Sequence, residues 1–242
     1  MHRNIAIIGA LFLLVGTLGA WRLIERVTPP ENPRDIVTIP EGWSVTEINK
    51  FLGEEGVLVD GELPQDLEGY LFPDTYEFFL DSTVEVVKEK FLGNLKAQLE
   101  TLEISMEDPK LEEVLILASL IQEEIKDPYE MRVVAGILKK RLEMGIPLQI
   151  DATLCYIKEK NGDGCLPVTK EDKALDSLYN TYLHQGLPLS PISNPGLDAI
   201  KAALNPANSP YLYYVSDPET GKTIFGKTLD EHNQNVIKYL SE

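Results

Sequence analysis

The sequence predicts an α+β fold in which an N-terminal transmembrane helix precedes a small strand–helix module and a mainly helical region that ends in a β-hairpin and a helix. Three observations predict this fold. Residues 5–21 form an uncharged apolar run, residues 36–39 alternate as a β-strand does, and Ser, Thr or Asp followed three residues later by Glu opens several helical stretches. A chain of 242 residues is long enough to bury a substantial core.

The apolar run IAIIGALFLLVGTLGAW (5–21) is typical of a membrane span. Continued through Ile24, a helix at about 1.5 Å per residue approaches the roughly 30 Å hydrocarbon core of a bilayer. Trp21 and Arg22 suit the membrane interface that follows. We therefore expect a transmembrane anchor over residues 1–27. A cleaved signal peptide is the alternative, although its apolar region would be long and its cleavage site poor.

The next segments predict a linker and a small module. The sequence TPPENPRD (28–35) is Pro-rich and polar, as extended linkers are. Residues 36–39 then alternate like a strand, and Ser44 followed by Glu47 forms a capping box that opens a helix. We expect a strand–helix module over residues 36–66.

The remainder, residues 67–242, is predicted to be mainly helical. The expected helices span residues 82–102, 111–125, 127–145, 197–204 and 228–240. Capping pairs open three of them: Ser82 with Glu85, Asp127 with Glu130, and Thr228 with Glu231. The turn sequence DPETG (217–221) lies between two short β-rich segments and predicts a hairpin near the C-terminus.

The two cysteines indicate a local cross-link. Cys155 and Cys165 flank the sequence NGDG (161–164), which holds two strong turn signals. We expect a hairpin closed by a disulfide, which is typical of an oxidising compartment. Two unpaired thiols are the alternative. A zinc site is poorly supported, because no histidine lies at ligand spacing, and we expect no metal or cofactor.

Composition and motifs exclude several classes of function. The formal net charge of −17 argues against nucleic-acid binding through a Lys/Arg surface. No phosphate loop, dinucleotide fingerprint, GxSxG or HExxH motif occurs. His2, His184 and His232 lie in polar contexts and leave little for a catalytic triad. Acid–base chemistry by carboxylates remains, and 39 acidic residues require a further criterion to choose among them.

The expected helix 111–125 supplies that criterion. At 100° per residue, Glu124 falls between Leu120 and Leu117, on the apolar side of the helix. A carboxyl group that is desolvated there has a raised pKa, as a general acid near neutral pH requires. Glu113 shares this sector, and the helix end gives Glu124 a route to water. The geometry therefore selects a candidate without proving it.

Four segments carry a resemblance to a known family: LEGYLFPDTYEF (67–78), LASLIQEEIKDPYEMRVVAGILKKRLEMGIPLQIDATLCY (117–156), YNTYLHQGLPLSPISNPGLDAIKAALNPANSPYLYYV (179–215) and FGKTLDEHN (225–233). In this order they resemble the endolytic murein transglycosylases (MltG/YceG-like family), membrane-anchored enzymes that cleave peptidoglycan glycan strands internally. The upstream segment 37–58 looks like the LysM-like module of that family, in a shortened form. The resemblance thus implies a reduced LysM-like module over 36–66 and a transglycosylase catalytic region over 67–242.

The resemblance also implies roles for individual residues. The catalytic glutamate of the family falls on Glu124, and the second glutamate that the family commonly has two residues earlier is Gln122 here. The expected substrate-binding residues are Gln122, Gln149, Asp151, Tyr179 and Asn180. Structural roles compete with substrate binding: Asp151 as a turn cap, Tyr179 as a core residue and Asn180 as a ligand of backbone. Glu68 and Asp74 look like scaffold or cleft-wall groups.

The implied reaction is lytic transglycosylation, in which one carboxyl group serves as acid and then as base, so no second carboxylate is required. The implied partners are peptidoglycan glycan strands, the cytoplasmic membrane through the N-terminal helix, and cell-wall synthases, with no nucleic acid. The substrate places the catalytic region outside the cytoplasm. A non-catalytic, membrane-tethered peptidoglycan-binding scaffold is the main alternative, supported by Gln122 and the shortened N-terminal region. A plain hydrolase is a third.

Overall fold

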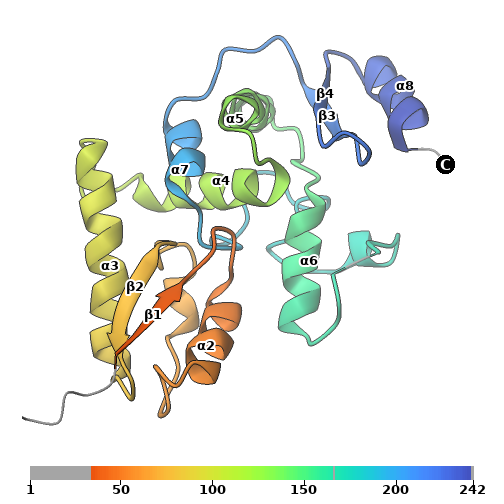
Figure 1. Cartoon of the computed structure of the whole chain (residues 1–242). Coiled ribbons are helices and arrows are strands. Elements are labelled where there is room, and N and C mark those ends of the chain that lie inside the picture. The colour runs from red at the N-terminus through yellow and green to blue at the C-terminus, as the bar shows by residue number, and fades with distance from the viewer. Residues whose placement is uncertain (1–33, 166, 241–242) are drawn as a thin grey trace, which may run out of the picture. The chain divides into compact units, whose positions relative to one another are not determined.

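The computed structural model describes residues 34–165 and 167–240, which form one compact unit (Figure 1). The expected anchor at 1–27 and most of the expected linker lie outside the described residues. The described part is a mostly helical α+β structure with two separate two-stranded antiparallel sheets. None of its helices combines the length and the apolar character that crossing a bilayer requires.

The first sheet pairs β1 (Arg34–Thr38) with β2 (Thr75–Phe79). β1 begins two residues earlier than the alternation predicts, because Arg34 pairs with Phe79 and its guanidinium lies 4.5 Å from the centre of that ring. β2 was not predicted. Its two inward side chains, Tyr76 and Phe78, are buried.

Two helices complete this part of the fold. α2 (Val45–Glu54) begins at the predicted capping box, which is confirmed. The cap of α3 (Val84–Thr101) lies one residue later than predicted, because Thr83 and not Ser82 caps the helix and accepts a hydrogen bond from the amide of Val86. Figure 1 shows the β1–β2 sheet with α2 and α3 beside it. Their inward side chains form one hydrophobic cluster, which includes Val37, Ile39, Ile48, Leu52, Phe78 and Phe91.

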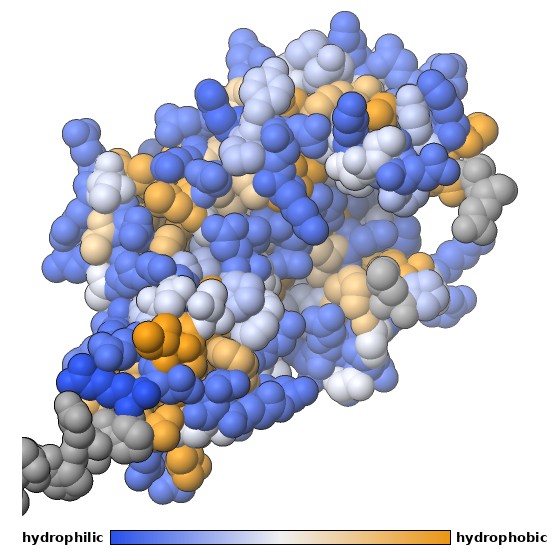
Figure 2. Space-filling model, viewed as in Figure 1, coloured by the Kyte–Doolittle hydropathy of each residue, from blue (hydrophilic) through white to orange (hydrophobic). Residues whose placement is uncertain are grey.

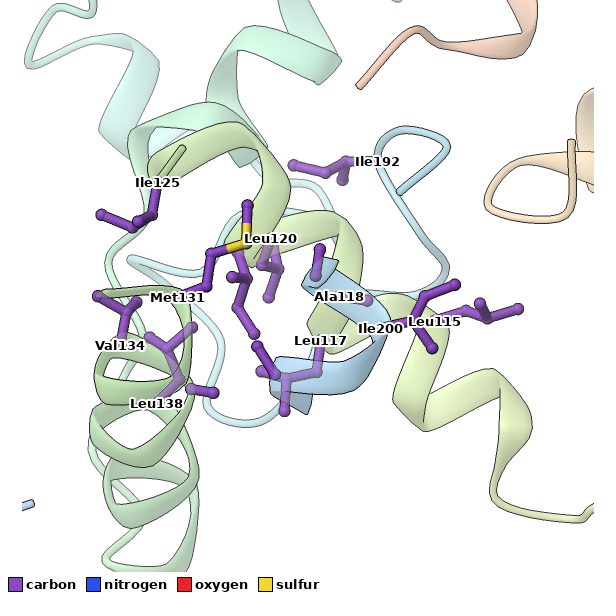
Figure 3. Close-up of a cluster of buried hydrophobic side chains, with 14 of the residues drawn as sticks. Leu115, Leu117, Ala118, Leu120, Ile125, Met131, Val134, Leu138, Ile192 and Ile200 are labelled. Atoms are coloured by element: carbon purple, nitrogen blue, oxygen red, sulfur yellow. The ribbon is translucent and has the colours of Figure 1, made fainter. Parts of the chain in front are cut away.

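Three predicted helices are confirmed: α4 (Leu111–Glu124), α5 (Pro128–Glu143) and α7 (Leu197–Leu204). A second hydrophobic cluster, which was not predicted, forms around them. Figure 3 shows side chains that meet between these helices, among them Leu117, Leu120, Met131, Leu138 and Ile200. The Asp127 cap of α5 is confirmed, because its carboxylate accepts from the amides of Tyr129 and Glu130. The Glu130 half of the predicted pair does not form, because the Glu130 carboxylate accepts from the Thr223 hydroxyl instead. Gly145 follows the helix with φ +66°. α4 is buried along most of its length, which fixes where its last residues lie.

The predicted hairpin between the cysteines is wrong. Residues Asp151–Lys160 form helix α6, with Thr153, Leu154 and Tyr156 buried. The Asn-Gly pair ends this helix instead of turning a hairpin: Gly162 has φ +83°, and the amides of Gly162 and Asp163 return to the carbonyls of Glu159 and Lys158. This is a Schellman motif, which uses the same left-handed glycine that a hairpin turn uses.

The C-terminal hairpin and helix are confirmed. β3 (Tyr213–Ser216) pairs with β4 (Thr223–Gly226), and α8 (Leu229–Leu240) packs against both strands. The Asp217 carboxylate closes the turn by accepting from the Glu219 amide and the Thr220 hydroxyl. Two short 3₁₀ helices, η1 (Gln65–Leu67) and η2 (Asp172–Ala174), complete the elements.

The predicted division between residues 36–66 and 67–242 stays a prediction. Apolar contacts cross it, because the first cluster combines Val37 and Ile48 with Leu71 and Phe91.

Candidate active site

A cleft with a volume of about 300 Å³ lies where α2, α4 and α6 approach one another. Its lining comes from the turn and first residues of α2, from the end of α4, from one face of α6 and from two loops: Gly42, Ser44, Glu47, Glu123, Glu124, Ala152, Cys155, Tyr156, Glu159, Cys165 and Ile192. The cleft holds four glutamates and no lysine or arginine. The predicted catalytic residue, Glu124, is one of them.

Glu124 is the last residue of α4 and is partly buried. The helix stops there because Ile125 turns to an extended backbone conformation and buries its side chain. Leu120 and Ile121, one turn earlier, are fully buried and hold the helix end in place. Glu113, which shares the same sector in the sequence pattern, is exposed and lies outside the cleft lining.

The surroundings of Glu124 favour its protonated form near neutral pH. Burial raises its pKa to about 7, against a hydrogen bond from the Tyr214 hydroxyl that lowers it. The nearby charges of Asp151 and Glu123 raise it further. A carboxyl group with this pKa holds a proton at neutrality and also releases it readily, which is the property that general acid–base catalysis needs.

Gln122 and Gln149, two predicted substrate-binding residues, both have protein partners. The Gln122 side-chain oxygen accepts from the Gly196 amide at the start of α7, at 3.0 Å. Gln149 adopts a left-handed backbone conformation, φ +55°, and its side-chain oxygen accepts from Arg141 Nη2 at 3.1 Å. Neither residue lines the cleft. These contacts give both glutamines a positioning role in the described structure.

Asp151 lies close to Glu124 but does not cap a turn. It is the first residue of α6, and its Oδ1 accepts from the Tyr182 hydroxyl at 2.5 Å. The same oxygen lies 3.9 Å from Lys173 Nζ, in a pair whose two side chains are both about half exposed. Asp151 is therefore accessible to solvent, does not line the cleft, and acts on Glu124 through its charge.

Tyr179 and Asn180 have the structural roles that compete with substrate binding. The Tyr179 hydroxyl bonds to Ser190 Oγ at 2.7 Å, and its ring centre lies 5.1 Å from that of Tyr156. Asn180 is fully buried, and its amide group donates to the carbonyls of Lys173 and Leu175. Both amide hydrogens of Asn180 are thus used to shape the loop, which leaves none for a sugar.

Glu68 is a buried scaffold group, as its sequence context suggests. Its Oε1 accepts from the Val45 amide at 3.0 Å and from Asn194 Nδ2 at 3.1 Å, and its Oε2 accepts from the Tyr156 hydroxyl at 3.2 Å. Burial raises its pKa to about 7. Because Tyr156 lines the cleft, Glu68 connects the start of α2 to the cleft wall on α6. Asp74 accepts from Asn94 Nδ2 outside the cleft.

Sequence reasoning missed Tyr214 and Arg141. Tyr214 lies on β3, 90 residues after Glu124, so no helical pattern connects the two. Arg141 is 6% exposed, and its Nη2 donates to the carbonyl of Pro147 at 2.6 Å and to Gln149. Its guanidinium lies 5.7 Å from the centre of the Tyr213 ring. The only available signal was the position of Tyr214 inside the segment YLYYV.

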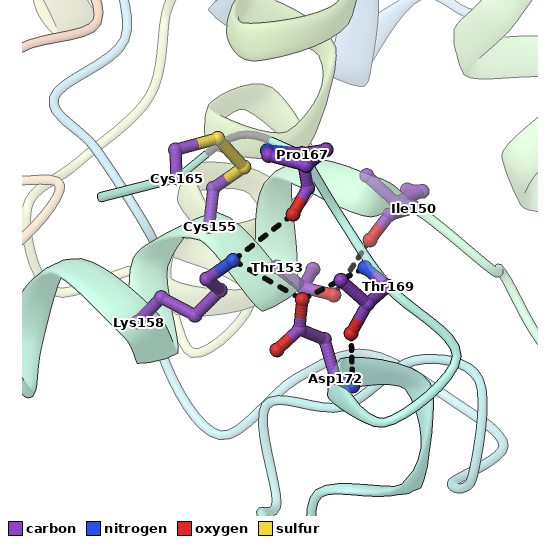
Figure 4. The surroundings of a disulfide bond; sticks show 8 residues. All are labelled: Ile150, Thr153, Cys155, Lys158, Cys165, Pro167, Thr169 and Asp172. Carbon is purple, nitrogen blue, oxygen red and sulfur yellow. Dashed lines mark hydrogen bonds and ion pairs between the residues drawn. A yellow bond between two sulfur atoms is a disulfide. The ribbon is translucent and has the colours of Figure 1, made fainter. Parts of the chain in front are cut away.

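A disulfide joins Cys155 to Cys165 at the edge of the cleft (Figure 4). It ties the loop after α6 back to the helix. Lys158 adds a second tie, because its Nζ donates to the carbonyl of Pro167 and pairs with the Asp172 carboxylate, each at 3.1 Å. Figure 4 shows both ties on the same helix. The loop wall of the cleft is thus fixed at two points.

The chain was compared with known proteins. The sequence model of the YceG-like family matches residues 9–238. The endolytic murein transglycosylase of Bacillus subtilis is 37% identical over 178 residues, which cover 72% of this chain and 48% of that protein. The protein of the same name from Streptococcus pneumoniae serotype 2 is 31% identical over 180 residues, which cover 72% of this chain and 32% of that protein. The chain therefore spans less than half the length of these relatives.

A solved structure agrees with the sequence comparison. The crystal structure of a yceG-like protein from Listeria monocytogenes aligns with a TM-score of 0.68 and 28% sequence identity. The alignment covers 83% of this chain and 75% of that one. With a family match that extends over almost the whole sequence, the chain belongs to the YceG-like family.

Proposed function

We propose that this protein is an endolytic peptidoglycan transglycosylase that cleaves the bond between N-acetylmuramic acid and N-acetylglucosamine inside glycan strands. Family membership and two relatives named endolytic murein transglycosylase support the reaction class. The observation that carries the proposal is Glu124, a carboxyl group in a cleft whose pKa is raised to about 7. Glu124 is the acid and the base of the reaction.

In the first half of the reaction, protonated Glu124 donates its proton to the glycosidic oxygen. The bond from this oxygen to C1 of N-acetylmuramic acid breaks, and N-acetylglucosamine leaves with a new 4-hydroxyl group. The transition state has oxocarbenium character, as in other glycosidic cleavages. Glu124 is now ionised.

In the second half, the Glu124 carboxylate removes the proton of the muramic acid 6-hydroxyl. The freed oxygen attacks C1 and closes a 1,6-anhydro ring, and the proton returns to Glu124. No water is consumed, so one carboxyl group is sufficient. A pKa near the working pH suits a group that must give and then take a proton.

The substitution Glu124→Gln tests this role. The amide keeps the size of the side chain and the hydrogen bond from Tyr214, so the fold is expected to remain intact. It cannot donate and accept a proton, so 1,6-anhydro ends are expected to disappear from digests of purified glycan. Glu113→Gln, an exposed change on the same helix, is the matched control and is expected to retain full activity. Full activity of Glu124→Gln would rule the assignment out.

Mass spectrometry of the digests also separates the other functions. A plain hydrolase gives reducing ends, and a non-catalytic scaffold gives no cleavage. The scaffold is disfavoured because a binding protein gains nothing from a desolvated carboxyl group in its cleft. The presence of Gln122 in the sequence favours the scaffold. In the structure its side-chain oxygen accepts a hydrogen bond from the Gly196 amide.

We further propose that residues 1–27 anchor the protein in the cytoplasmic membrane with the catalytic region outside the cytoplasm. The apolar run in the sequence supports an anchor, and a substrate in the cell wall supports this orientation. Protease added to intact spheroplasts is expected to degrade the catalytic region, and protection of that region would contradict the orientation. Co-purification of a cell-wall synthase from solubilised membranes would test the proposed partner class.

A further inference from the structure

The C-terminal hairpin brings one side chain to the proposed catalytic group. Tyr214, on β3, places its hydroxyl 3.2 Å from Glu124 Oε2. Burial and the neighbouring Glu124 raise the pKa of Tyr214 well above its usual value. The phenol therefore keeps its proton at any pH at which the enzyme works, and toward Glu124 it acts only as a donor.

This contact makes the two oxygens of Glu124 different. Oε2 accepts from Tyr214, whereas Oε1 has no hydrogen-bond partner among the described residues. A carboxyl proton on Oε2 would displace the phenol or point away from it. The proton that reaches the substrate is therefore carried on Oε1, and Tyr214 holds the carboxyl plane in one orientation.

The strand that carries Tyr214 is fixed from the side of α5. Arg141, on α5, is buried and is fixed by Pro147 and Gln149, and its guanidinium lies 5.7 Å from the ring centre of Tyr213, the residue before Tyr214. A second tie joins the hairpin to α5, because Thr223 on β4 donates its hydroxyl to Glu130 Oε2 at 2.5 Å. The position of the phenol thus depends on packed elements and not on a loose loop.

We propose that Tyr214 is a positioning residue for the transglycosylation reaction, which holds Glu124 Oε2 and reserves Oε1 for proton transfer to and from the glycan. The proposal rests on the proposed function and adds the C-terminal hairpin to the machinery of the site. Tyr214 acts through Glu124 and does not itself exchange protons with the substrate.

The hydrogen bond from Tyr214 also determines in which direction the pKa of Glu124 moves when the hydroxyl is removed. Four charged or titratable groups act on Glu124 or are affected by it: Glu123, Asp151, Tyr182 and Tyr214. Glu47 of α2 and Glu159 of α6 line the same cleft, and Arg141 of α5 affects the two tyrosines. Asp151 and Glu123 disfavour the ionised form of Glu124, and the Tyr214 hydrogen bond favours it. Loss of the phenol hydroxyl therefore raises the pKa of Glu124. Because the first step needs protonated Glu124, activity falls as the pH rises through this pKa.

The substitution Tyr214→Phe tests the proposal in the full-length protein. A hydrogen bond to a charged group is worth enough free energy to move the pKa by about one unit. The alkaline limb of the profile of kcat/KM against pH is expected to move upward by about one pH unit. Loss of the fixed orientation is expected to lower kcat about tenfold at the optimum, with KM nearly unchanged. If Tyr214 had only a structural role, the substitution would leave the alkaline limb at the same pH.

Tyr211→Phe is the matched control. Tyr211 precedes the same strand and stacks on Phe225, and its hydroxyl has no hydrogen bond among the described residues. The substitution Tyr211→Phe is expected to leave both the alkaline limb of the pH profile and kcat unchanged. An unmoved limb in Tyr214→Phe, in a protein that melts like the wild type, would overturn the proposal.

A direct titration separates failure of the proposal from failure of the proposed function. NMR of isotope-labelled glutamate side chains gives the pKa of Glu124, with its signal assigned by its absence in Glu124→Gln. An upward shift in Tyr214→Phe supports the contact even if the wild type makes no anhydro ends, a result that would overturn only the function. An unchanged pKa overturns the role of Tyr214 whatever the activity.

Discussion

At the end of α4, burial and hydrogen bonding act on one carboxyl group in opposite directions. Burial raises the pKa of Glu124, the Tyr214 hydroxyl lowers it, and the result is about 7. Either influence alone would give a poorer catalyst: a fully desolvated acid would not release its proton, and a strongly hydrogen-bonded one would not hold it. The balance depends on two elements far apart in the sequence.

Burial raises the pKa of Glu68 to a similar value, but Glu68 has a structural role. It is 2% exposed, does not line the cleft and accepts hydrogen bonds from three donors. Its pKa in the folded protein, about 7, lies above the value of 4.5 for an unperturbed carboxyl group. The folded state therefore binds this proton more tightly than the unfolded state. The resulting stabilisation is complete below pH 4.5 and is lost as the pH rises through 7.

Glu68→Gln is expected to remove this pH dependence. The amide oxygen still accepts from Val45 and Asn194, and its NH₂ group donates to the Tyr156 hydroxyl. Between pH 5 and 8, the free energy of unfolding of the wild type should fall relative to the variant by about 2–3 kcal/mol. Urea titrations at both pH values measure it, with Glu113→Gln as control. A constant difference would contradict the protonated state of Glu68.

Single residues could be predicted from the sequence only where a local pattern constrained them. The helical pattern of α4 placed Glu124 on an apolar sector, and the structure shows its carboxyl partly buried there. The roles of Asn180 and Gln149 depend on contacts across loops, with Lys173 and Leu175 in one case and Arg141 in the other. No periodicity encodes such contacts. Resemblance to a family points to these positions without telling what their side chains bind.

At the scale of elements, the residues that cap the start of a helix predict the structure more reliably than the Asn-Gly pair that predicts a turn. Ser44 and Asp127 open helices where predicted, because a cap and its helix are adjacent in sequence. The Asn161-Gly162 pair predicts a hairpin turn but ends a helix, because a left-handed glycine serves a Schellman motif as well as a hairpin turn. What decided between them was the burial of Thr153, Leu154 and Tyr156, which only tertiary packing provides.

The disulfide at the end of α6 is expected to stabilise both the fold and the cleft. It closes a short loop between Cys155 and Cys165, separated by 10 residues, for which chain entropy gives about 3 kcal/mol. The double substitution of both cysteines by serine should lower the free energy of unfolding by about this amount. Since both residues line the cleft, KM for glycan should rise more than kcat falls.

Dithiothreitol provides the control for this prediction. It should destabilise the wild type as much as the double substitution does, and it should not affect the substituted protein. Equal melting temperatures of oxidised wild type and double variant would show that the disulfide does not hold the loop.

Two helical glycines give a matched test of packing. A Cβ at Gly136, on α5, would lie 2.0 Å from the carbonyl oxygen of Ala207. This is a backbone atom, so no side-chain rotation can relieve the clash. Gly93, on α3, has no atom within 4 Å of such a Cβ. Gly136→Ala should destabilise the protein by about 1–3 kcal/mol, and Gly93→Ala should stabilise it by up to about 1 kcal/mol. Thermal unfolding measures both, and equal effects would contradict the close approach of residues 206–209 to α5.

At the scale of the whole molecule, one buried asparagine connects the two hydrophobic clusters. The Asn194 side chain donates to the carbonyl of Trp43 and to Glu68, and accepts from the Leu71 amide. Its backbone forms two further bonds, with Gly42 and Trp43. The small sheet and α2 are therefore joined firmly to the helical part, and this junction builds one side of the cleft. Gly42, Ser44 and Glu47 thus bring the N-terminal part of the described chain directly into the candidate active site.

The net charge of −17 describes the surface more than the chemistry. The face drawn in Figure 2 is mostly hydrophilic, with hydrophobic residues in small groups. Such a surface disfavours self-association of the part of the chain that the structure describes. The acidic lining of the cleft raises the pKa of Glu124 through its neighbour Glu123, so a small part of this charge serves the proposed reaction.

In the proposed mechanism, Glu124 acts as acid and then as base without activating water. Digestion of purified glycan in water labelled with heavy oxygen, followed by mass spectrometry of the new ends, tests it most directly. The mechanism predicts 1,6-anhydro-muramic acid ends that carry no label, in digests by the wild type and by Glu113→Gln, and no new ends with Glu124→Gln. Reducing ends that carry one labelled oxygen would contradict it and identify a hydrolase.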